Sequence, residues 1–207
     1  MNLLAAAREL TSASPNVRRH TITMGPSSIV IRSARFEDAP RLHELHTASV
    51  RALCAGHYSA DVIDAWLSNR APSGYLGPIE RGALFVAERH GRVIGFGEAR
   101  PGTVIAVYVD PAEILQGVGS AILRHAVALA RSEHDGPVRL EATLNARDFY
   151  ERAGFREIKR CKSDAVMLMF QWSLSSTLPA NNAVKRSARQ GPSPTALRRG
   201  AAAYRVC

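Results

Sequence analysis

The pattern of hydrophobic and polar positions divides the chain into a structured middle and two polar ends. Between residues 28 and 172, short apolar runs alternate with stretches in which apolar residues recur at helical spacing. Residues 1–27 contain Ser-Ala-Ser-Pro and Gly-Pro-Ser-Ser, and residues 173–207 have almost no large apolar side chains. Such ends bury too little surface to offset the entropy of ordering them. We therefore predict one domain over residues 28–172, a flexible N-terminal segment over 1–27, and a basic, disordered tail over 173–207.

The predicted domain alternates helices and strands. The order is strand, helix, helix, three strands, helix, strand, helix and a final hairpin. These elements fall at residues 29–35, 36–53, 59–67, 83–88, 92–99, 103–109, 117–131, 138–142, 146–152, 155–160 and 165–172. We expect Asp38 and Ser59 to cap the first two helices, and the turns His90-Gly91 and Pro101-Gly102 to make the three central strands an antiparallel meander. The predicted fold class is α/β, with a mixed, mostly antiparallel sheet and helices on both of its faces.

The formal net charge of +9 comes from the ends of the chain. Residues 173–207 carry six basic side chains and no acidic one, and residues 1–24 carry three basic side chains and one acidic one. About +1 therefore remains for residues 25–172, which form a near-neutral body. We expect a solvated basic tail and no specific nucleic-acid partner. The alternative is that the tail binds DNA electrostatically, in which case the binding would depend strongly on salt.

Several classes of protein are excluded by what the sequence lacks. The three cysteines are odd in number and widely spaced, so they predict neither a disulfide framework nor a metal site. There is no run of 18 apolar residues and no signal-like N-terminus, so we predict a cytoplasmic protein with no membrane contact. The sequence leaves open whether the protein is a monomer or a homodimer.

One glycine motif carries candidate chemistry. Gln116-Gly-Val-Gly-Ser120 follows a strand and opens a helix, where unpaired N–H groups and the helix dipole attract an anion. Glycines there let phosphate oxygens approach the backbone. A dinucleotide fingerprint requires a third Gly or Ala where Ile122 stands, and a Walker A motif requires Lys where Ser120 stands. Both of those nucleotide-binding motifs are therefore excluded.

Three segments together resemble a known family. Val109-Asp-Pro, Gly117-Val-Gly-Ser-Ala-Ile-Leu and Phe149-Tyr-Glu-Arg-Ala-Gly-Phe are similar to the two central motifs of the GNAT (GCN5-related) N-acetyltransferases. By element order the similarity covers residues 29–172. The segment His57-Tyr-Ser, followed by Ala65-Trp66, is further similar to a bacterial subgroup of uncharacterised GNAT proteins. The resemblance implies the GNAT fold, in which two central parallel strands splay apart in a V.

The resemblance also implies how acetyl-CoA is bound and used. The pantetheine arm would pair with the strand ending at Val109, and N–H groups at the helix start would hold the diphosphate. The implied binding residues are Val107, Tyr108, Val109, Leu115, Gln116, Gly117, Val118, Gly119, Ser120 and Thr143. An amine of an unidentified acceptor, which we expect to be a small molecule rather than a protein, would attack the thioester directly. Tyr150 matches the family's general acid, and Glu98 and His57 are equal candidates for the base.

Three positions depart from the family pattern. Ile114 and Leu115 stand where a polar residue and a glycine usually precede the glycine core, and Thr143 replaces an asparagine seven residues before Tyr150. The two apolar side chains could block the helix entrance. The alternative to an active acetyltransferase is therefore a degenerate GNAT-like module that binds CoA weakly or not at all and has no catalytic activity.

Overall fold

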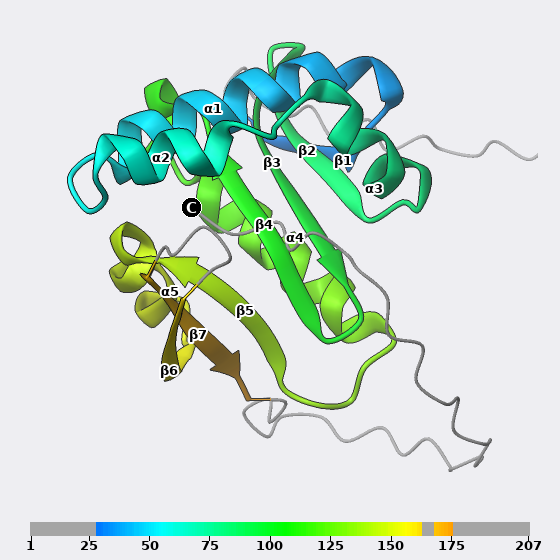
Figure 1. Ribbon diagram of the computed structural model, residues 1–207. Coiled ribbons are helices and arrows are strands. Elements are labelled where there is room, and N and C mark those ends of the chain that lie inside the picture. Colours follow the sequence, from blue (N-terminus) through cyan, green and yellow to red (C-terminus); the bar gives the residue numbers. More distant parts are fainter. Residues whose placement is uncertain (1–27, 163–167, 176–207) are drawn as a thin grey trace, which may run out of the picture.

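The computed structural model describes residues 28–162 and 168–175 (Figure 1). The predicted N-terminal segment and most of the predicted tail lie outside the described residues. The last described strand ends at Leu174, so the sheet continues two residues past the predicted end of the domain.

The predicted order of elements is confirmed. The strands are β1 (Val30–Ser33), β2 (Leu84–Arg89), β3 (Arg92–Arg100), β4 (Thr103–Val109), β5 (Val138–Thr143), β6 (Arg156–Lys162) and β7 (Leu168–Leu174). The helices are α1 (Ala39–Cys54), α2 (Ala60–Leu67), α3 (Leu76–Glu80), α4 (Val118–Ser132) and α5 (Arg147–Arg152). The sequence did not predict α3 or the 3₁₀ turn before it (Pro72–Tyr75), because prolines and glycines interrupt the apolar spacing there.

Both predicted helix caps are confirmed in position but not in their side-chain bonding. Asp38 and Ser59 occupy the cap positions of α1 and α2, but neither side chain makes a capping hydrogen bond. The Asp38 carboxylate instead accepts hydrogen bonds from the Arg32 guanidinium at 2.8 and 3.0 Å and from the Arg35 N–H at 2.8 Å. An ion pair competes successfully for this carboxylate, which ties β1 to the start of α1.

The described strands form one seven-stranded sheet in the order β1-β2-β3-β4-β5-β7-β6. All neighbours are antiparallel except β4 and β5, which are parallel. These two strands share a single register position, Thr103 opposite Arg139, whereas β5 pairs with β7 along its whole length. Beyond Thr103 the two strands diverge (Figure 1). The predicted V-shaped splay between two central parallel strands is thus confirmed.

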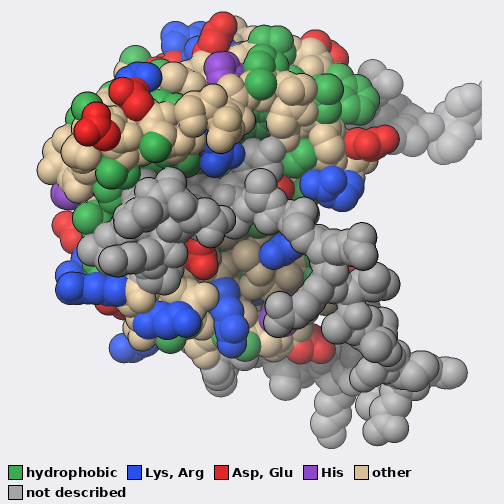
Figure 2. Space-filling view, viewed as in Figure 1, with side chains coloured by type: hydrophobic (Ala, Val, Ile, Leu, Met, Phe, Trp, Pro, Cys, Tyr) green, Lys and Arg blue, Asp and Glu red, His purple; other side chains and the backbone are tan. Residues whose placement is uncertain are grey.

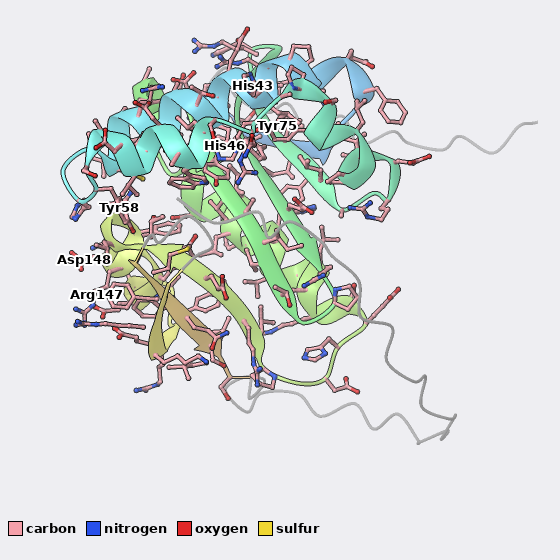
Figure 3. All side chains as sticks on the ribbon, in the orientation of Figure 1. His43, His46, Tyr58, Tyr75, Arg147 and Asp148 are labelled. Carbon is pink, nitrogen blue, oxygen red and sulfur yellow. The ribbon has the colours of Figure 1, made fainter. Side chains whose placement is uncertain are left out.

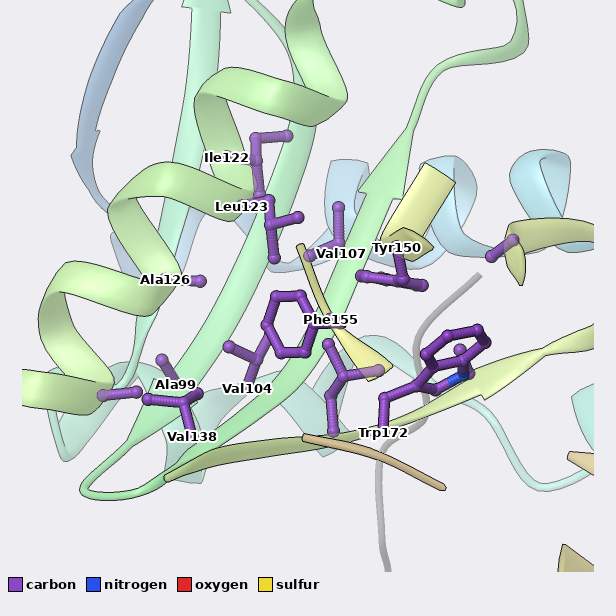
Figure 4. Packing of buried hydrophobic residues seen from close by; sticks show 14 of the residues in the cluster. Ala99, Val104, Val107, Ile122, Leu123, Ala126, Val138, Tyr150, Phe155 and Trp172 are labelled. Carbon is purple, nitrogen blue, oxygen red and sulfur yellow. The ribbon is translucent and has the colours of Figure 1, made fainter. Parts of the chain in front are cut away.

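Helices cover both faces of the sheet, as predicted. Helices α4 and α5 pack on the face that presents Val107 of β4 and Trp172 of β7 (Figure 4). Helices α1, α2 and α3 cover the opposite face, which presents Tyr108. Helix α4 comes close to β3 because Gly97 has no side chain: a Cβ there would lie 2.8 Å from Ile122. The helix that carries the glycine motif is therefore seated directly on the centre of the sheet.

Candidate functional site

Helix α4 begins at the predicted glycine motif. Gly117 occupies the cap position with φ of 80°, a left-handed conformation that glycine adopts without strain. Gly119 is different, because packing does not demand a glycine there. A Cβ at Gly119 would meet Phe149 at 3.5 Å and Val109 at 3.6 Å, both ordinary contacts. The space beside Gly119 is therefore compatible with a ligand that approaches the backbone closely.

The two apolar residues before the motif do not block it. The Leu115 side chain is 100% exposed and that of Ile114 is 42% exposed, so neither is packed over the helix start. Leu115 has φ of 60°, a left-handed conformation that is uncommon for a residue with a side chain. Leu115 therefore takes the backbone shape of the usual glycine and directs its side chain into solvent.

The loop that leads into α4 is anchored at Asp110. Its carboxylate accepts hydrogen bonds from Arg41 and Arg92 at 2.6 Å each, and from the Ala112 N–H at 3.0 Å. Burial acts to raise the pKa of Asp110, but these N–H and guanidinium groups outweigh it, and the net pKa is lowered. The carboxylate is thus held in its charged, anchoring form.

The side chain of Gln116, at the start of the motif, forms hydrogen bonds that involve this loop. The Gln116 side chain accepts a hydrogen bond from Arg89 at 2.7 Å and donates one to the Ala112 carbonyl at 3.2 Å. Gln116 can therefore serve a bound anion only through its backbone. Val118 is buried at the start of α4, whereas Ser120 borders a cavity described below.

The predicted pantetheine-binding segment runs along the splay. Val107, Tyr108 and Val109 pair with β3 on one edge of β4. The other edge of β4 faces the gap left by β5, and Thr143 lies buried at the end of β5. Because side chains alternate along a strand, Val107 faces α4 and Tyr108 faces α1. Different side chains of β4 therefore lie next to the gap on the two faces of the sheet.

Tyr150, the predicted acid, lies on the α4 face. It is fully buried, and its ring centroid is 4.9 Å from that of Phe149 and 5.8 Å from that of Phe155. Tyr150 belongs to the same buried cluster as Val107, and Figure 4 shows both on the side of the sheet covered by α4. The phenol is therefore held rigidly, next to the strand that borders the gap.

Glu98, one of the two predicted bases, lies on the opposite face. It pairs with Ala106 of β4 in register, and both are buried on the side covered by α1. Burial raises the pKa of the Glu98 carboxyl to about 7, although the charges of Arg81 and Arg100 act to lower it. A carboxyl with this pKa can accept and release a proton near neutral pH, as a general base must.

His57, the other predicted base, lies on the surface of the α1–α2 loop. Its neighbour Tyr58 makes the structural contact: the Tyr58 hydroxyl accepts a hydrogen bond from the Leu144 N–H at 2.8 Å. Nearby, the Cys54 thiol donates to the Asn145 side chain at 3.4 Å. The α1–α2 loop therefore joins the segment after β5, with Tyr58 directed toward it (Figure 3). Glu98 and Tyr150 are buried on the two faces of the sheet, whereas His57 is exposed.

His46 was not among the site residues predicted from the sequence, but its surroundings in the structure are unusual for a histidine. Its Nδ1 is 2.8 Å from the Tyr75 hydroxyl, and its ring centroid is 4.0 Å from that of Tyr108 (Figure 3). Burial, helped by the charges of Arg70 and His43, lowers the pKa of His46 to about 3, so the ring is neutral. The signal in the sequence was its place on the apolar stripe of α1, one residue after Leu45.

Three buried polar atoms on this face lack a hydrogen-bond partner within the described part of the chain. They are His46 Nε2, Ser49 Oγ and Trp66 Nε1. The ring centroids of His46 and Trp66 are 6.0 Å apart, and Ser49 follows His46 by about one turn of α1. Buried polar groups are normally satisfied, so these three atoms indicate a place for water or a polar ligand.

A cavity of about 350 Å³ lies between α4 and α5. It is lined by Ser120, Leu123, Arg124, Val127, Phe149, Arg152, Ala153, Phe155 and Leu174. Ser120 belongs to the first turn of α4, and Arg124 and Arg152 bring positive charge from the two helices. The sequence analysis did not identify these arginines, because nothing in their local pattern shows that α4 and α5 lie side by side.

Within residues 28–162 and 168–175, no group of three or more His, Cys, Asp or Glu side chains is arranged to hold a metal ion. In the same part of the chain, no helix has the length and apolar character needed to cross a membrane.

Comparisons with known proteins agree with this geometry. Residues 80–157 match the model of the acetyltransferase (GNAT) domain. The uncharacterized N-acetyltransferase YafP of Escherichia coli K12 is 27% identical over 134 residues, which cover 65% of this chain and 85% of YafP.

Two solved structures share the fold. A GCN5-related N-acetyltransferase from Rhodopseudomonas palustris superimposes with a TM-score of 0.61 at 22% identity, covering 72% of this chain and 96% of the other. The PaiA N-acetyltransferase of Thermoplasma acidophilum, solved in complex with coenzyme A, gives 0.59 at 23% identity, with 72% and 99% covered. Residues 80–157, which include the splayed strand β4 and the glycine motif at the start of α4, thus match a GNAT acetyltransferase domain, and the chain shares the fold of solved GNAT structures.

Proposed function

We propose that this protein transfers an acetyl group from acetyl-CoA to the amine of a small molecule. The observation that carries the proposal is the parting of β4 and β5 after one shared register position, beside a helix start over which neither Ile114 nor Leu115 is packed. Similarity to YafP, which is named as an N-acetyltransferase, and to PaiA, solved with coenzyme A, supports this choice of chemistry.

The residues present fit a CoA thioester. Backbone N–H groups from Gln116 to Ser120 would hold the diphosphate, because they open helix α4 and packing does not require the glycine at position 119. The cavity beyond Ser120 would take the nucleotide end of CoA, with Arg124 and Arg152 paired to its remaining phosphate. The pantetheine arm would lie along β4 as an added strand. Bound acetyl-CoA supplies an acetyl group already activated as a thioester.

Two proton transfers accompany the reaction, and the candidate groups lie on opposite faces of the sheet. An amine with a pKa near ~10 is mostly protonated at neutral pH and must lose a proton before it attacks. Glu98, on the α1 face, would take that proton directly or through a water. As the C–N bond forms and the C–S bond breaks, Tyr150 on the α4 face would donate its phenolic proton to the departing sulfur.

The acceptor would bind on the α1 face, where Glu98 and Tyr108 lie. We favour a small molecule because the polar groups without described partners on this face, His46 Nε2, Ser49 Oγ and Trp66 Nε1, are buried rather than spread over an exposed surface. Aromatic walls and a neutral imidazole suit an amine with an apolar body and one or two uncharged polar groups.

The direct test is calorimetric titration with acetyl-CoA, followed by a screen of amines in which released CoA is detected. We expect micromolar binding and turnover with at least one small amine. Failure to bind acetyl-CoA at millimolar concentration would reject the proposal. Binding without turnover across a broad set of amines would instead favour a CoA-binding module with no catalytic activity.

A further inference from the structure

We propose that Arg89 is a positioning residue that holds the loop before α4 in the shape needed to bind a diphosphate. The inference rests on the proposed function and concerns the same site. It starts from an oddity of this chain: the loop contains two exposed apolar residues, one of them in a left-handed conformation, and a restraint must hold it in that shape.

Arg89 bonds to the residues on either side of that apolar pair. One nitrogen of its guanidinium lies 2.6 Å from the Glu113 carboxylate and 2.7 Å from the Gln116 side-chain oxygen. Glu113 immediately precedes Ile114-Leu115, and Gln116 immediately follows it. The arginine thus fixes both ends of the strained dipeptide from a single point.

The restraint is strong because it is mostly shielded from water. The side chains of Arg89 and Glu113 are only 16% and 15% exposed. A charge-assisted hydrogen bond gains strength in such surroundings, and removing one partner leaves the other charge poorly solvated. The Gln116 side chain in turn donates to the Ala112 carbonyl at 3.2 Å, which extends the restraint to the earlier part of the loop.

The residues that restrain the loop belong to the β2–β3 hairpin of the sheet. Arg89 ends β2 and pairs in register with Arg92, which starts β3. Arg92 bonds to Asp110, the first residue of the same loop, at 2.6 Å. The closed end of the β2–β3 hairpin therefore holds the loop at its beginning through Arg92 and near its end through Arg89. The N–H groups from Gln116 onward are aimed before any ligand arrives, which reduces the ordering cost of binding.

The experiment replaces Arg89 with Met and measures acetyl-CoA affinity by calorimetry and amide hydrogen exchange of residues 110–120 without ligand. We expect the Kd to rise about tenfold and exchange in this segment to accelerate. Arg89→Lys should recover most of the affinity, because both bonds come from one nitrogen that an ammonium group can replace. A merely structural role would not predict this recovery of affinity.

Arg32→Met is the matched control. Arg32 lies on the adjacent strand and bonds to Glu88 at 2.7 Å and to Asp38 at 2.8 Å, but it does not touch the loop. This variant should lose comparable thermal stability and bind acetyl-CoA as the unmodified protein does. Unchanged affinity in Arg89→Met, or equal affinity loss in Arg32→Met, would overturn the inference alone. If the unmodified protein does not bind acetyl-CoA, the proposed function fails and this inference falls with it.

Discussion

The two faces of strand β4 differ in the groups that each could offer to a ligand. On the α4 face, the loop before the helix is fixed by arginine–carboxylate pairs, and the groups that would meet the ligand are backbone N–H donors. On the α1 face, buried side chains include polar atoms that no described residue satisfies. A diphosphate is the same in every cofactor molecule, so backbone N–H groups held in one conformation are sufficient to bind it. Selecting one acceptor depends on side chains, and we expect the polar atoms on this face to be paired only when that acceptor is bound.

The largest expected effect comes from Gly119→Glu on the α4 face. The carboxylate would enter the space assigned to the diphosphate and repel it, so acetyl-CoA affinity should fall more than about 100-fold. Folding should be preserved, because a Cβ at Gly119 makes only ordinary contacts. Calorimetry and thermal melting check the two parts. Gly56→Glu is the matched control, since a Cβ there meets nothing within 4 Å. Normal affinity in Gly119→Glu would mean that the phosphates bind elsewhere.

Glu98→Gln tests the base on the α1 face. Turnover of an amine found by screening should fall about 100-fold with acetyl-CoA affinity unchanged. The pH–rate profile of the unmodified enzyme should rise through about pH 7, where Glu98 loses its proton, and this rise should disappear in the variant. If the variant shows the same pH–rate profile as the unmodified enzyme, Glu98 is not the general base, and His57 becomes the candidate.

The raised pKa of Glu98 also has a stability consequence. The native state holds this proton up to about pH 7, whereas the unfolded state releases it near pH 4.5. The native state therefore binds more protons between these values, and the unfolding free energy should fall by at most about 3 kcal/mol as pH rises from 4.5 to 7. Glu98→Gln should lack this decrease in denaturant titrations across the same range.

Tyr150→Phe tests the acid on the α4 face. A phenol is a modest acid toward a thiolate, so we expect turnover to fall about tenfold while the acetyl-CoA Kd stays within a factor of two. Steady-state rates and calorimetry separate the two quantities. Because the ring is fully buried, Phe preserves its packing against Phe149 and Phe155. An unchanged rate would limit Tyr150 to a packing role.

The smallest effect is expected from Tyr58→Phe, at the bridge between the α1–α2 loop and the segment after β5. Loss of the hydroxyl leaves the Leu144 N–H without this acceptor and should cost about 1 kcal/mol of unfolding free energy. Denaturant titration measures it. Acetyl-CoA affinity should change little, because the α4 turn is held separately by Arg89 and Asp110. A large affinity loss would show that the two faces are coupled.

Local patterns were sufficient for most of the fold. Short apolar runs predicted the strands, and turn residues such as His90-Gly91 predicted the meander. Helix α3 was missed because Gly77 and Pro78 disrupt its short apolar pattern, and packing against the preceding 3₁₀ turn and β2 stabilises it instead.

The candidate site likewise contains some residues that local motifs reveal and others that only tertiary contacts reveal. Gly117, Gly119 and Tyr150 could be identified because each belongs to a short motif. The contact of Arg89 with Glu113 spans 24 residues, and that of His46 with Tyr75 spans 29. The pKa of Glu98 depends on burial by distant elements. Such properties arise from tertiary structure, and a single sequence gives no local signal for them.

The parting of β4 and β5 sets a limit on what can be transferred. One end of the gap is closed by the shared position of Thr103 and Arg139. The segment at the other end is tied to the α1–α2 loop by Tyr58 and Cys54. Both ends of the opening are thus restrained, and Tyr150 beside strand β4 is fully buried. For the proposed reaction we therefore expect a two-carbon acyl group to be preferred, and donors with long or branched acyl chains to be poor substrates.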